Sequence, residues 1–172
     1  LGSAIALSAD GNTLAVGASG EDSAAKGVNG TSKDHASNTG AVYVFTRDAR
    51  GWKQQAYLKA SNAAGGAQFG SSVSLSADGN LLAVGAPGEA SSATGINGNQ
   101  NDDSMPSSGA AYVFARAGAT WSRQAYVKPS NTGGPDIGYQ FGFAVSISDD
   151  GSTLAVTQTS DPSNATGING DQ

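Results

Sequence analysis

The side chains best suited to chemistry lie in three polar, glycine-rich segments, and the chemistry they suggest is oxygen ligation of calcium. A carboxylate recurs at Glu21, Glu89 and Asp161, and an Asn-Gly pair follows each of them at the same spacing. Calcium takes roughly six to eight oxygen ligands from carboxylates, amides and backbone carbonyls. The segment 89–108 therefore predicts a calcium site formed by Glu89, Asn97, Asn99, Asp102 and Asp103. The equivalent positions in the other segments are Glu21, Asn29, Asp34, Asp161, Asn169 and Asp171.

The same side chains also have a purely structural interpretation. Asn, Asp and Gly accept left-handed backbone conformations and hydrogen-bond within their own turns, so a long loop collects them without any ligand. A loop ordered by calcium and a loop ordered by its own turns are both consistent with the sequence. Thermal stability that does not depend on calcium would favour the second interpretation.

No catalytic group can be assembled from this sequence. His35 is the only histidine and there is no cysteine, which excludes thiolate sites and multi-histidine zinc centres. Aspartates recur in Asp-Gly pairs at Asp10, Asp78 and Asp150, but tight hairpin turns account for such pairs. The sequence contains no Gly-x-Ser-x-Gly elbow, phosphate-binding loop or dinucleotide fingerprint. We therefore expect a protein that is not an enzyme.

Charge and hydropathy exclude two further classes of partner. The formal net charge is −5 and the 9 basic residues are scattered singly, so no nucleic-acid-binding surface is expected. No apolar run approaches the roughly 20 residues that cross a bilayer as a helix, so we expect no membrane span in this segment. A charged content of only 13%, many small polar residues and the lack of cysteine are typical of a secreted or cell-surface protein.

Internal repetition is the strongest signal in the chain. Three aligned segments start at Leu1, Phe69 and Phe141, and a second pair of segments starts at Gly40 and Gly109. The predicted repeats are residues 1–68, 69–140 and 141–172, of which the last is only a first half. Because both ends fall inside a repeat, we expect a segment of a larger protein.

Each full repeat predicts four β-strands. In the second repeat, Val73 and Leu75 alternate with serines, which is the period-two pattern of a half-buried strand. The chain then turns at an Asp-Gly pair and returns through 81–84. A third strand at 110–114 is apolar on both faces, and a fourth runs from 121 to 128. No segment shows sustained helical periodicity, so the chain is predicted to be all-β.

Sheets that are apolar on both faces must be covered on both faces. A β-propeller achieves this by packing each four-stranded antiparallel blade between two others. Small residues at Ala83, Gly85 and Ala86 would let neighbouring blades approach closely. The chain is therefore predicted to form about two and a half blades, fewer than the roughly four to eight blades of a closed propeller.

Recurring aromatic residues are expected to pack between blades. Trp52 and Trp121 each begin a fourth strand at the same position of the repeat. A tryptophan beside a turn could stack on a sugar ring, but recurrence at one repeat position favours packing. The matched residues Tyr57 and Tyr126 receive the same interpretation.

A lysine recurs at the end of the fourth strand. Lys59 and Lys128 stand at matched positions before Ser-Asn. Exposed lysine on an edge strand opposes unwanted pairing with other strands. We therefore expect both lysines to face the solvent and to keep the outer strand soluble.

With these strands placed, the sequence resembles an FG-GAP repeat, the blade unit of integrin α-subunit propellers. The resemblance rests on Phe69-Gly70, on Val84-Gly85-Ala86-Pro87 and on Ala111-Tyr112-Val113-Phe114. The run SxDGxxLAVGA, followed by a long loop, GAxYVF and WxxQAYxKxSN, is similar to the FG-GAP-like repeats of large bacterial surface and secreted proteins. The resemblance covers essentially the whole chain, and it implies a propeller fold and a role such as adhesion, ligand binding or scaffolding.

The first and third copies depart from the family pattern. Leu1 replaces the Phe of the first Phe-Gly, and Ala18-Ser19 and Thr157-Gln158 stand where Ala86-Pro87 completes the pattern. The integrin-type calcium loop, an Asp-x-Asp-x-Asp-Gly run, is missing. Calcium binding by that loop is therefore not implied by the resemblance.

Together these features predict a non-enzymatic extracellular propeller segment for adhesion, ligand binding or protein–protein interaction. Binding residues usually lie on loops that a rigid scaffold positions, so the contact surface is expected in the loops 21–39 and 89–108. Its partner would be a protein or a glycan, or further blades or copies of the parent protein. Two alternatives stay open: a structural subunit of a surface layer or fibre that pairs through blade edges, and an accessory propeller of a larger secreted enzyme.

Overall fold

Residues 2–132 and 138–160, described by a computed structural model, form strands, turns and loops without a helix. The first repeat contains β1 (Ile5–Leu7), β2 (Thr13–Ala18), β3 (Ala41–Asp48) and β4 (Gly51–Leu58). The second contains β5 (Ser72–Leu75), β6 (Leu81–Ala86), β7 (Ala110–Ala117) and β8 (Thr120–Val127). The third contains β9 (Val145–Ile147) and β10 (Leu154–Val156). The prediction of an all-β chain is confirmed, and no helix in the described ranges could span a membrane.

Neighbouring strands of the chain pair in simple antiparallel order. The first sheet has the order β1-β2-β3-β4 and the second has the order β5-β6-β7-β8, while β9 and β10 form a two-stranded sheet. The two four-stranded sheets share one irregularity, a register shift after Val44 in β3 and after Val113 in β7. Each sheet lies within one predicted repeat and has the form of a propeller blade.

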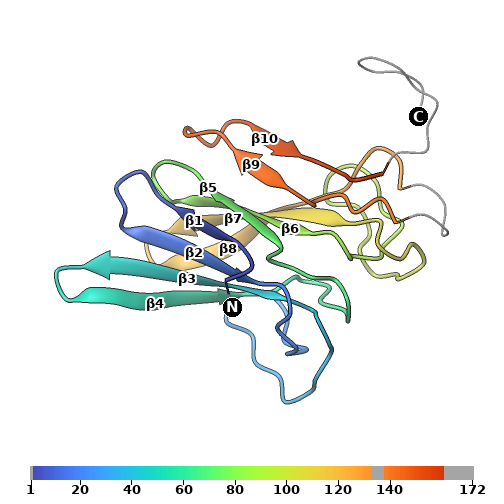
Figure 1. Ribbon diagram of the computed structural model, residues 1–172, viewed down its shortest axis with the longest axis horizontal. Helices are drawn as coiled ribbons and strands as arrows, with labels where there is room; N and C mark the ends of the chain where they lie inside the picture. The colour runs from blue at the N-terminus through green and yellow to red at the C-terminus, as the bar shows by residue number, and fades with distance from the viewer. Residues whose placement is uncertain (1, 133–137, 161–172) are drawn as a thin grey trace.

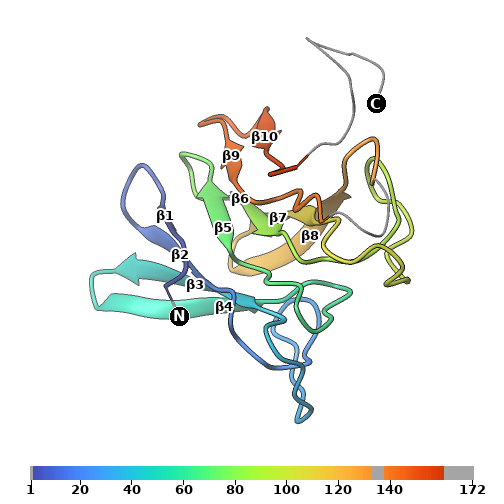
Figure 2. The same cartoon turned by 45° about the vertical axis from the view of Figure 1, so that its right-hand side comes forward.

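The three sheets lie one behind another, face against face. In both views the first sheet, the second sheet and the β9–β10 pair follow one another across the molecule (Figures 1 and 2), and β5 contacts β1 and β9. The short innermost strands are also joined through the backbone of their hairpin turns. The Ala9 amide donates to the Ala77 carbonyl and the Ala77 amide donates to the Asp149 carbonyl, both at 2.9 Å.

The Asp-Gly turns that contribute to this ladder are held by their own side chains. In the β5–β6 turn, the Asp78 carboxylate accepts hydrogen bonds from the Ser76 hydroxyl at 2.6 Å and from the Asn80 amide at 2.9 Å. The β1–β2 and β9–β10 turns repeat these contacts around Asp10 and Asp150. The hairpin interpretation of the three aspartates therefore accounts for every one of these contacts.

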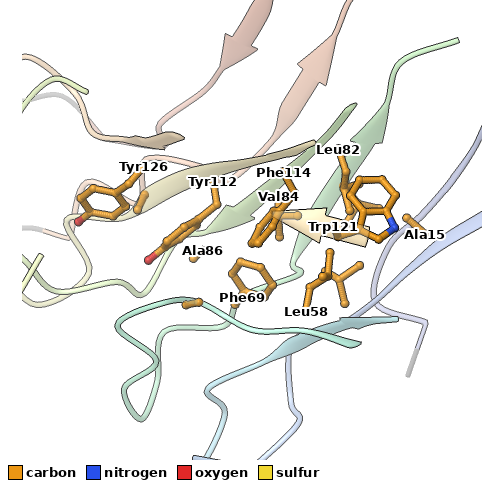
Figure 3. Packing of buried hydrophobic residues seen from close by; sticks show 14 of the residues in the cluster. Ala15, Leu58, Phe69, Leu82, Val84, Ala86, Tyr112, Phe114, Trp121 and Tyr126 are labelled. Carbon is orange, nitrogen blue, oxygen red and sulfur yellow. The ribbon is translucent and has the colours of Figure 1, made fainter. Parts of the chain in front are cut away.

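An apolar core fills the space between the first and second sheets. Phe69 lies at its centre, with the ring centroids of Tyr112 and Phe114 at 5.3 and 6.0 Å from that of Phe69 (Figure 3). The first sheet contributes Leu58, and the second contributes Leu82 from the opposite side of the gap. All five side chains are at most 1% exposed, as expected for sheets whose apolar residues are covered by a neighbour.

Trp121 confirms the prediction that the recurring tryptophan packs between blades. Its side chain is 3% exposed, and its indole N–H donates to Gln55 Oε1 of the first sheet at 2.9 Å. The matched Trp52 is 46% exposed, because no described residue of the chain covers that side of the first sheet. Position in the stack, rather than sequence, therefore decides which of the two is buried.

Gly85 in β6 sets the distance between the second sheet and the third repeat. A Cβ atom at this position would overlap the backbone carbonyl oxygen of Gly142. The Gly85 carbonyl also accepts a hydrogen bond from the Gly70 amide at 2.9 Å, which ties β6 to the segment just before β5. This arrangement supports the prediction that small residues in β6 permit close approach of the blades.

We predict that Gly85→Ala destabilises the protein by about 1–3 kcal/mol, the usual cost of inserting an atom into a packed interior. Gly20→Ala is the matched control, because its Cβ would meet nothing closer than Asn38 Oδ1 at 3.5 Å. Urea unfolding followed by tryptophan fluorescence measures both. Equal midpoints for the two variants would contradict the close approach.

Candidate functional site

Two long connections leave the same end of the stacked sheets. They join β2 to β3 (residues 19–40) and β6 to β7 (residues 87–109), whereas the β1–β2, β3–β4 and β5–β6 hairpins lie at the opposite end (Figure 1). Antiparallel order places alternate connections at the same end of a sheet. These two loops therefore form one rim of the molecule, and they contain most of the candidate residues.

A buried lysine–glutamate pair closes the base of each loop. Lys128 Nζ lies 2.7 Å from Glu89 Oε2, and their side chains are 0% and 2% exposed. In the first repeat Lys59 Nζ lies 2.6 Å from Glu21 Oε2, with side-chain exposures of 0% and 20%. Each glutamate begins a loop, and each lysine directly follows the outer strand of the same sheet. The ion pair thus ties the start of the loop to the strand that forms the edge of the sheet.

The expectation that Lys59 and Lys128 face the solvent is wrong. Both ammonium groups are buried because each has polar partners that replace water. Lys128 Nζ donates to the Ser91 carbonyl at 2.9 Å and to Ser108 Oγ at 2.6 Å, in addition to Glu89. Lys59 Nζ donates to Thr39 Oγ1, the residue that matches Ser108.

The base of each loop is also closed through the backbone. The Gly109 amide donates to the Glu89 carbonyl at 2.8 Å, and the Gly40 amide donates to the Glu21 carbonyl at 2.9 Å. Ser108 Oγ donates to the Glu89 carbonyl at 3.2 Å as well as to the Ser91 carbonyl at 2.9 Å. A glutamate, a hydroxyl residue and a lysine therefore form one compact unit at the start and end of the loop.

In the second repeat this unit extends across the boundary between the two sheets. Glu89 Oε1 accepts hydrogen bonds from the Tyr126 hydroxyl at 2.8 Å and from Asn62 Nδ2 at 2.7 Å. The Tyr112 hydroxyl donates to Asn62 Oδ1 at 2.6 Å. Asn62 follows the outer strand of the first sheet, so its carboxamide links the first repeat to the buried carboxylate of the second.

Burial dominates the electrostatics of this cluster. Burial lowers the pKa of the Lys128 ammonium, and the Glu89 carboxylate opposes that change. The pKa of the Tyr112 and Tyr126 hydroxyls is raised, first by burial and then by the Glu89 charge. Both hydroxyls therefore remain neutral donors, as their hydrogen bonds to Asn62 and Glu89 require. The cluster has the character of a structural network in which every partner is satisfied.

The recurring Asn-Gly pair pins the middle of each loop to the outer strand. Asn97 Oδ1 accepts from the Tyr126 amide at 3.0 Å, and the Asn97 amide donates to the Tyr126 carbonyl at 2.7 Å. Asn29 makes the same two contacts with Tyr57 at 2.9 and 2.7 Å. Both asparagines have positive φ angles of 56° and 52°, a conformation that Asn accepts more readily than most residues. The turn-forming interpretation explains these two asparagines.

Asp102 organises the tip of the second loop. Its carboxylate accepts hydrogen bonds from the Ser92 amide and hydroxyl, both at 3.0 Å, and from the Ser104 hydroxyl at 2.7 Å. These donors, Ser104 foremost, hold the pKa of the carboxyl at about 2, below its ordinary value of 3.8. Asn99 makes a smaller turn by accepting from the Asn101 amide at 3.1 Å.

The predicted calcium ligands are divided among these different roles. Within residues 2–132 and 138–160, no three His, Cys, Asp or Glu side chains gather into a group that could hold a metal ion. Asp34 and His35 lie exposed in the first loop, where the backbone of His35 bridges Ser23. Asp161, Asn169 and Asp171 lie outside the described residues. Calcium binding therefore stays a prediction for this chain.

The part of the rim that is free to contact a partner is the loop tips. Hollows of about 320 and 270 Å³ lie beside the second loop, and both are lined by Asn62, Ala64 and Asp103. The tip of the first loop carries Lys33, Asp34 and His35, all exposed. The tips therefore present hydrogen-bonding groups and single charges to the solvent.

The sequence contained a signal for the buried ion pairs that composition alone does not reveal. A glutamate after the second strand, a hydroxyl residue before the third and a lysine after the fourth recur together in both full repeats. Solvent-exposed charges need no such joint recurrence, whereas a buried charge requires all of its partners at once. Considering these positions as one set would have predicted the cluster.

We predict that Lys128→Met destabilises the protein by about 3–5 kcal/mol, because Glu89 is then left as an uncompensated buried charge. Lys59→Met is the matched variant and should cost less, since the Glu21 side chain keeps 20% exposure to water. Urea unfolding midpoints compare the two. Equal losses, or a larger loss for Lys59→Met, would contradict the role assigned to burial.

We predict an acid-sensitive loop tip governed by Asp102. Its folded-state pKa of about 2 lies below its ordinary value of 3.8, so it stabilises the fold above that ordinary value. The stabilisation is lost as the pH falls through about 2. Carbon-detected NMR titration of the carboxyl should show this midpoint, and Ser104→Ala should raise it. An unchanged midpoint in that variant would contradict the assigned cause.

Comparison with known protein families identifies one segment of the chain. Residues 52–114 match the family model described as FG-GAP repeat. The matched segment begins in β4 and ends in β7, so the family unit combines the outer strand of one sheet with three strands of the next. No curated protein matches the chain.

Proposed function

Because the chain carries an FG-GAP repeat and is a β-propeller-type domain, we propose that it is a non-enzymatic binding segment of an extracellular or cell-surface protein. Its contact surface is the rim formed by the tips of the two long loops, residues 31–38 and 99–107. The observation that carries this proposal is the shared anchoring of both loops by a buried Lys–Glu pair. FG-GAP repeats are typical of extracellular proteins, which supports the proposed location.

The anchors separate a constant frame from variable tips. In each loop the Glu–Lys pair and the Asn-Gly pin contact the outer strand of their own sheet. The tips between the Asn-Gly pairs and the ends of the loops contain no buried ion pair, and they differ in length and charge. The second tip is also held by Gln100, whose Oε1 accepts from Arg123 of β8 at 3.0 Å. A loop held at its base costs less entropy to order on binding than a free loop does. Such a rim therefore suits recognition of a protein or a glycan.

A binding role accounts for the described polar residues without catalysis. The Glu89 carboxylate is paired with Lys128, and its side chain is only 2% exposed. The exposed aspartates of the hairpins hold their own turns. His35 lies exposed on a loop tip. We therefore assign no chemical step to this segment.

The test exchanges the two tips, residues 31–38 and 99–107, and leaves all anchors in place. Beads coated with the parent chain or the exchanged chain are applied to immobilised glycans and extracellular-matrix proteins. We expect the exchange to change adhesion to whichever glycan or matrix protein the parent chain binds by about tenfold or more, because a contact patch is lost. The exchanged chain should still unfold cooperatively, because both Lys–Glu pairs and both Asn-Gly pairs are unchanged, with a midpoint lowered only by loss of the Asp102 and Gln100 contacts.

The matched control changes the opposite end of the molecule. Arg50→Ala and Lys53→Ala alter exposed side chains around the β3–β4 hairpin and should leave adhesion unchanged. Adhesion that is unchanged by the exchange of tips but reduced by Arg50→Ala and Lys53→Ala would place the contact surface at the β3–β4 hairpin and contradict the proposal. No adhesion of the parent chain to any member of the panel would also count against the proposal.

A further inference from the structure

The second loop meets the first repeat at a hollow of about 270 Å³, which crosses the boundary between the two sheets. Three segments of the chain line it: Lys26 from the first loop, residues 61–64 after β4, and residues 100, 101 and 103 from the second loop. The volume is close to the roughly 300 Å³ at which ligand pockets begin. The hollow therefore suits one small chemical unit rather than a long ligand.

One wall of this hollow is fixed by contacts of Gln100. Its side-chain Oε1 accepts hydrogen bonds from Ser61 Oγ and from the Arg123 guanidinium, both at 3.0 Å. Its backbone carbonyl accepts a hydrogen bond from Asn62 Nδ2 at 3.3 Å. These contacts hold the loop against the first repeat before any ligand arrives, and a preformed site loses less entropy on binding than a free loop does.

The polar side chains around the hollow fall into two groups. Those of Asn99 and Asp102 accept hydrogen bonds from their own loop, and neither lines the hollow. Those of Lys26, Asn101 and Asp103 line it, and they form no hydrogen bond or ion pair with another described residue. Turn formation therefore explains the first group and leaves the second group without a role.

The two charges at the hollow limit the kind of ligand that fits. An acidic ligand is attracted by Lys26 but repelled by Asp103, and a basic ligand meets the reverse. An apolar ligand would take both charges out of water without giving them partners, which is costly. A neutral ligand that is rich in hydroxyl groups satisfies both charges, because each hydroxyl donates one hydrogen bond and accepts others.

The rest of the lining fits the other parts of such a ligand. Ala63 and Ala64 give the hollow a small apolar wall. The Asn101 carboxamide and the Nε2 group of Gln100 provide further donors that no described residue uses. A sugar ring carries hydroxyl groups around its edge and C–H groups on its faces, so it matches a site with both polar and apolar walls.

We propose that this hollow binds one neutral sugar unit of a glycan. Hydroxyl groups of the sugar donate to the Asp103 carboxylate and accept from Lys26 and Asn101, while a C–H face of the ring packs on Ala63 and Ala64. The inference rests on the binding role proposed above, and it names the class of partner and the place of contact. Because both repeats line the hollow, the bound sugar bridges their boundary.

The test titrates the full chain, labelled with nitrogen-15, with the methyl glycosides of glucose, galactose, mannose and N-acetylglucosamine. A chelator is present, so that calcium does not contribute to binding. The carboxamide N–H signals of Gln100 and Asn101 report contact with the sugar. We expect at least one of the four sugars to shift both signals in a saturable way. No saturable shift with any of them would overturn the proposal.

Variants of the two charged residues locate the site. Lys26→Ala and Asp103→Ala should each weaken the affinity for that sugar by about tenfold or more, because each removes a hydrogen bond to a charged group. Lys33→Ala and Asp34→Ala are the matched controls, since they remove the same charges from exposed positions outside the hollow. Equal losses in the controls, or tighter binding of free glycine than of any sugar, would contradict a neutral sugar in this hollow.

The bead assay separates failure of this inference from failure of the proposed function. Adhesion to a matrix protein that is lost on exchange of the tips but kept by Lys26→Ala and Asp103→Ala would remove the sugar site and leave the binding role in place. A saturable sugar titration with a chain whose beads adhere to no member of the panel would support the sugar site and contradict the adhesion role.

Discussion

The buried lysine–glutamate pair is the interaction on which the rest of the first and second repeats depends. Moving an ammonium and a carboxylate out of water is costly, and their attraction offsets this cost only if every remaining hydrogen-bonding group is satisfied. Ser91, Ser108, Tyr126 and Asn62 supply those partners around the pair in the second repeat. The long loop must therefore begin and end at fixed places, since both ends contribute groups to the cluster. A compact base under a polar, variable tip follows from this requirement.

The stack of sheets obeys a second constraint, because each central strand is apolar on both faces. The second sheet satisfies it with the first sheet on one side and the β9–β10 pair on the other. Gly85 and the ladder of hairpin turns set how closely these layers approach. Asn62 contributes both to the packing of the sheets and to the anchoring of the loop, since it lies in the first repeat and completes the buried cluster of the second. Packing between repeats and anchoring of the loop are therefore coupled through one carboxamide.

Most of the fold could be predicted from the sequence because its signals are local. Alternation in 72–75 and the Asp-Gly turns define the strands without knowledge of their neighbours. The positive φ of Asn29 and Asn97 also follows from residue type and the adjacent glycine. These features are determined over a few residues, and the structure reproduces them.

The buried lysines could not be predicted in the same way, because their environment is not local. Lys128 meets Glu89 and Ser108 only after β6, β7 and β8 have paired and the loop has closed. Lysine is rarely buried without such partners, so residue type argued for an exposed position. The different fates of Trp52 and Trp121 have a similar origin, since both lie in the same sequence context and differ only in the neighbouring sheet.

The most direct test of this account is the exchange of the lysine ammonium protons in the intact chain. Nitrogen–proton NMR detects an ammonium group only when its protons leave slowly for water, as in a buried and fully hydrogen-bonded group. The account predicts resolved Nζ signals for Lys128 and Lys59 at neutral pH, while that of the exposed Lys53 is lost to exchange. Exchange of the Lys128 protons as fast as those of Lys53 would contradict the central claim that a buried ion pair holds the loop in place.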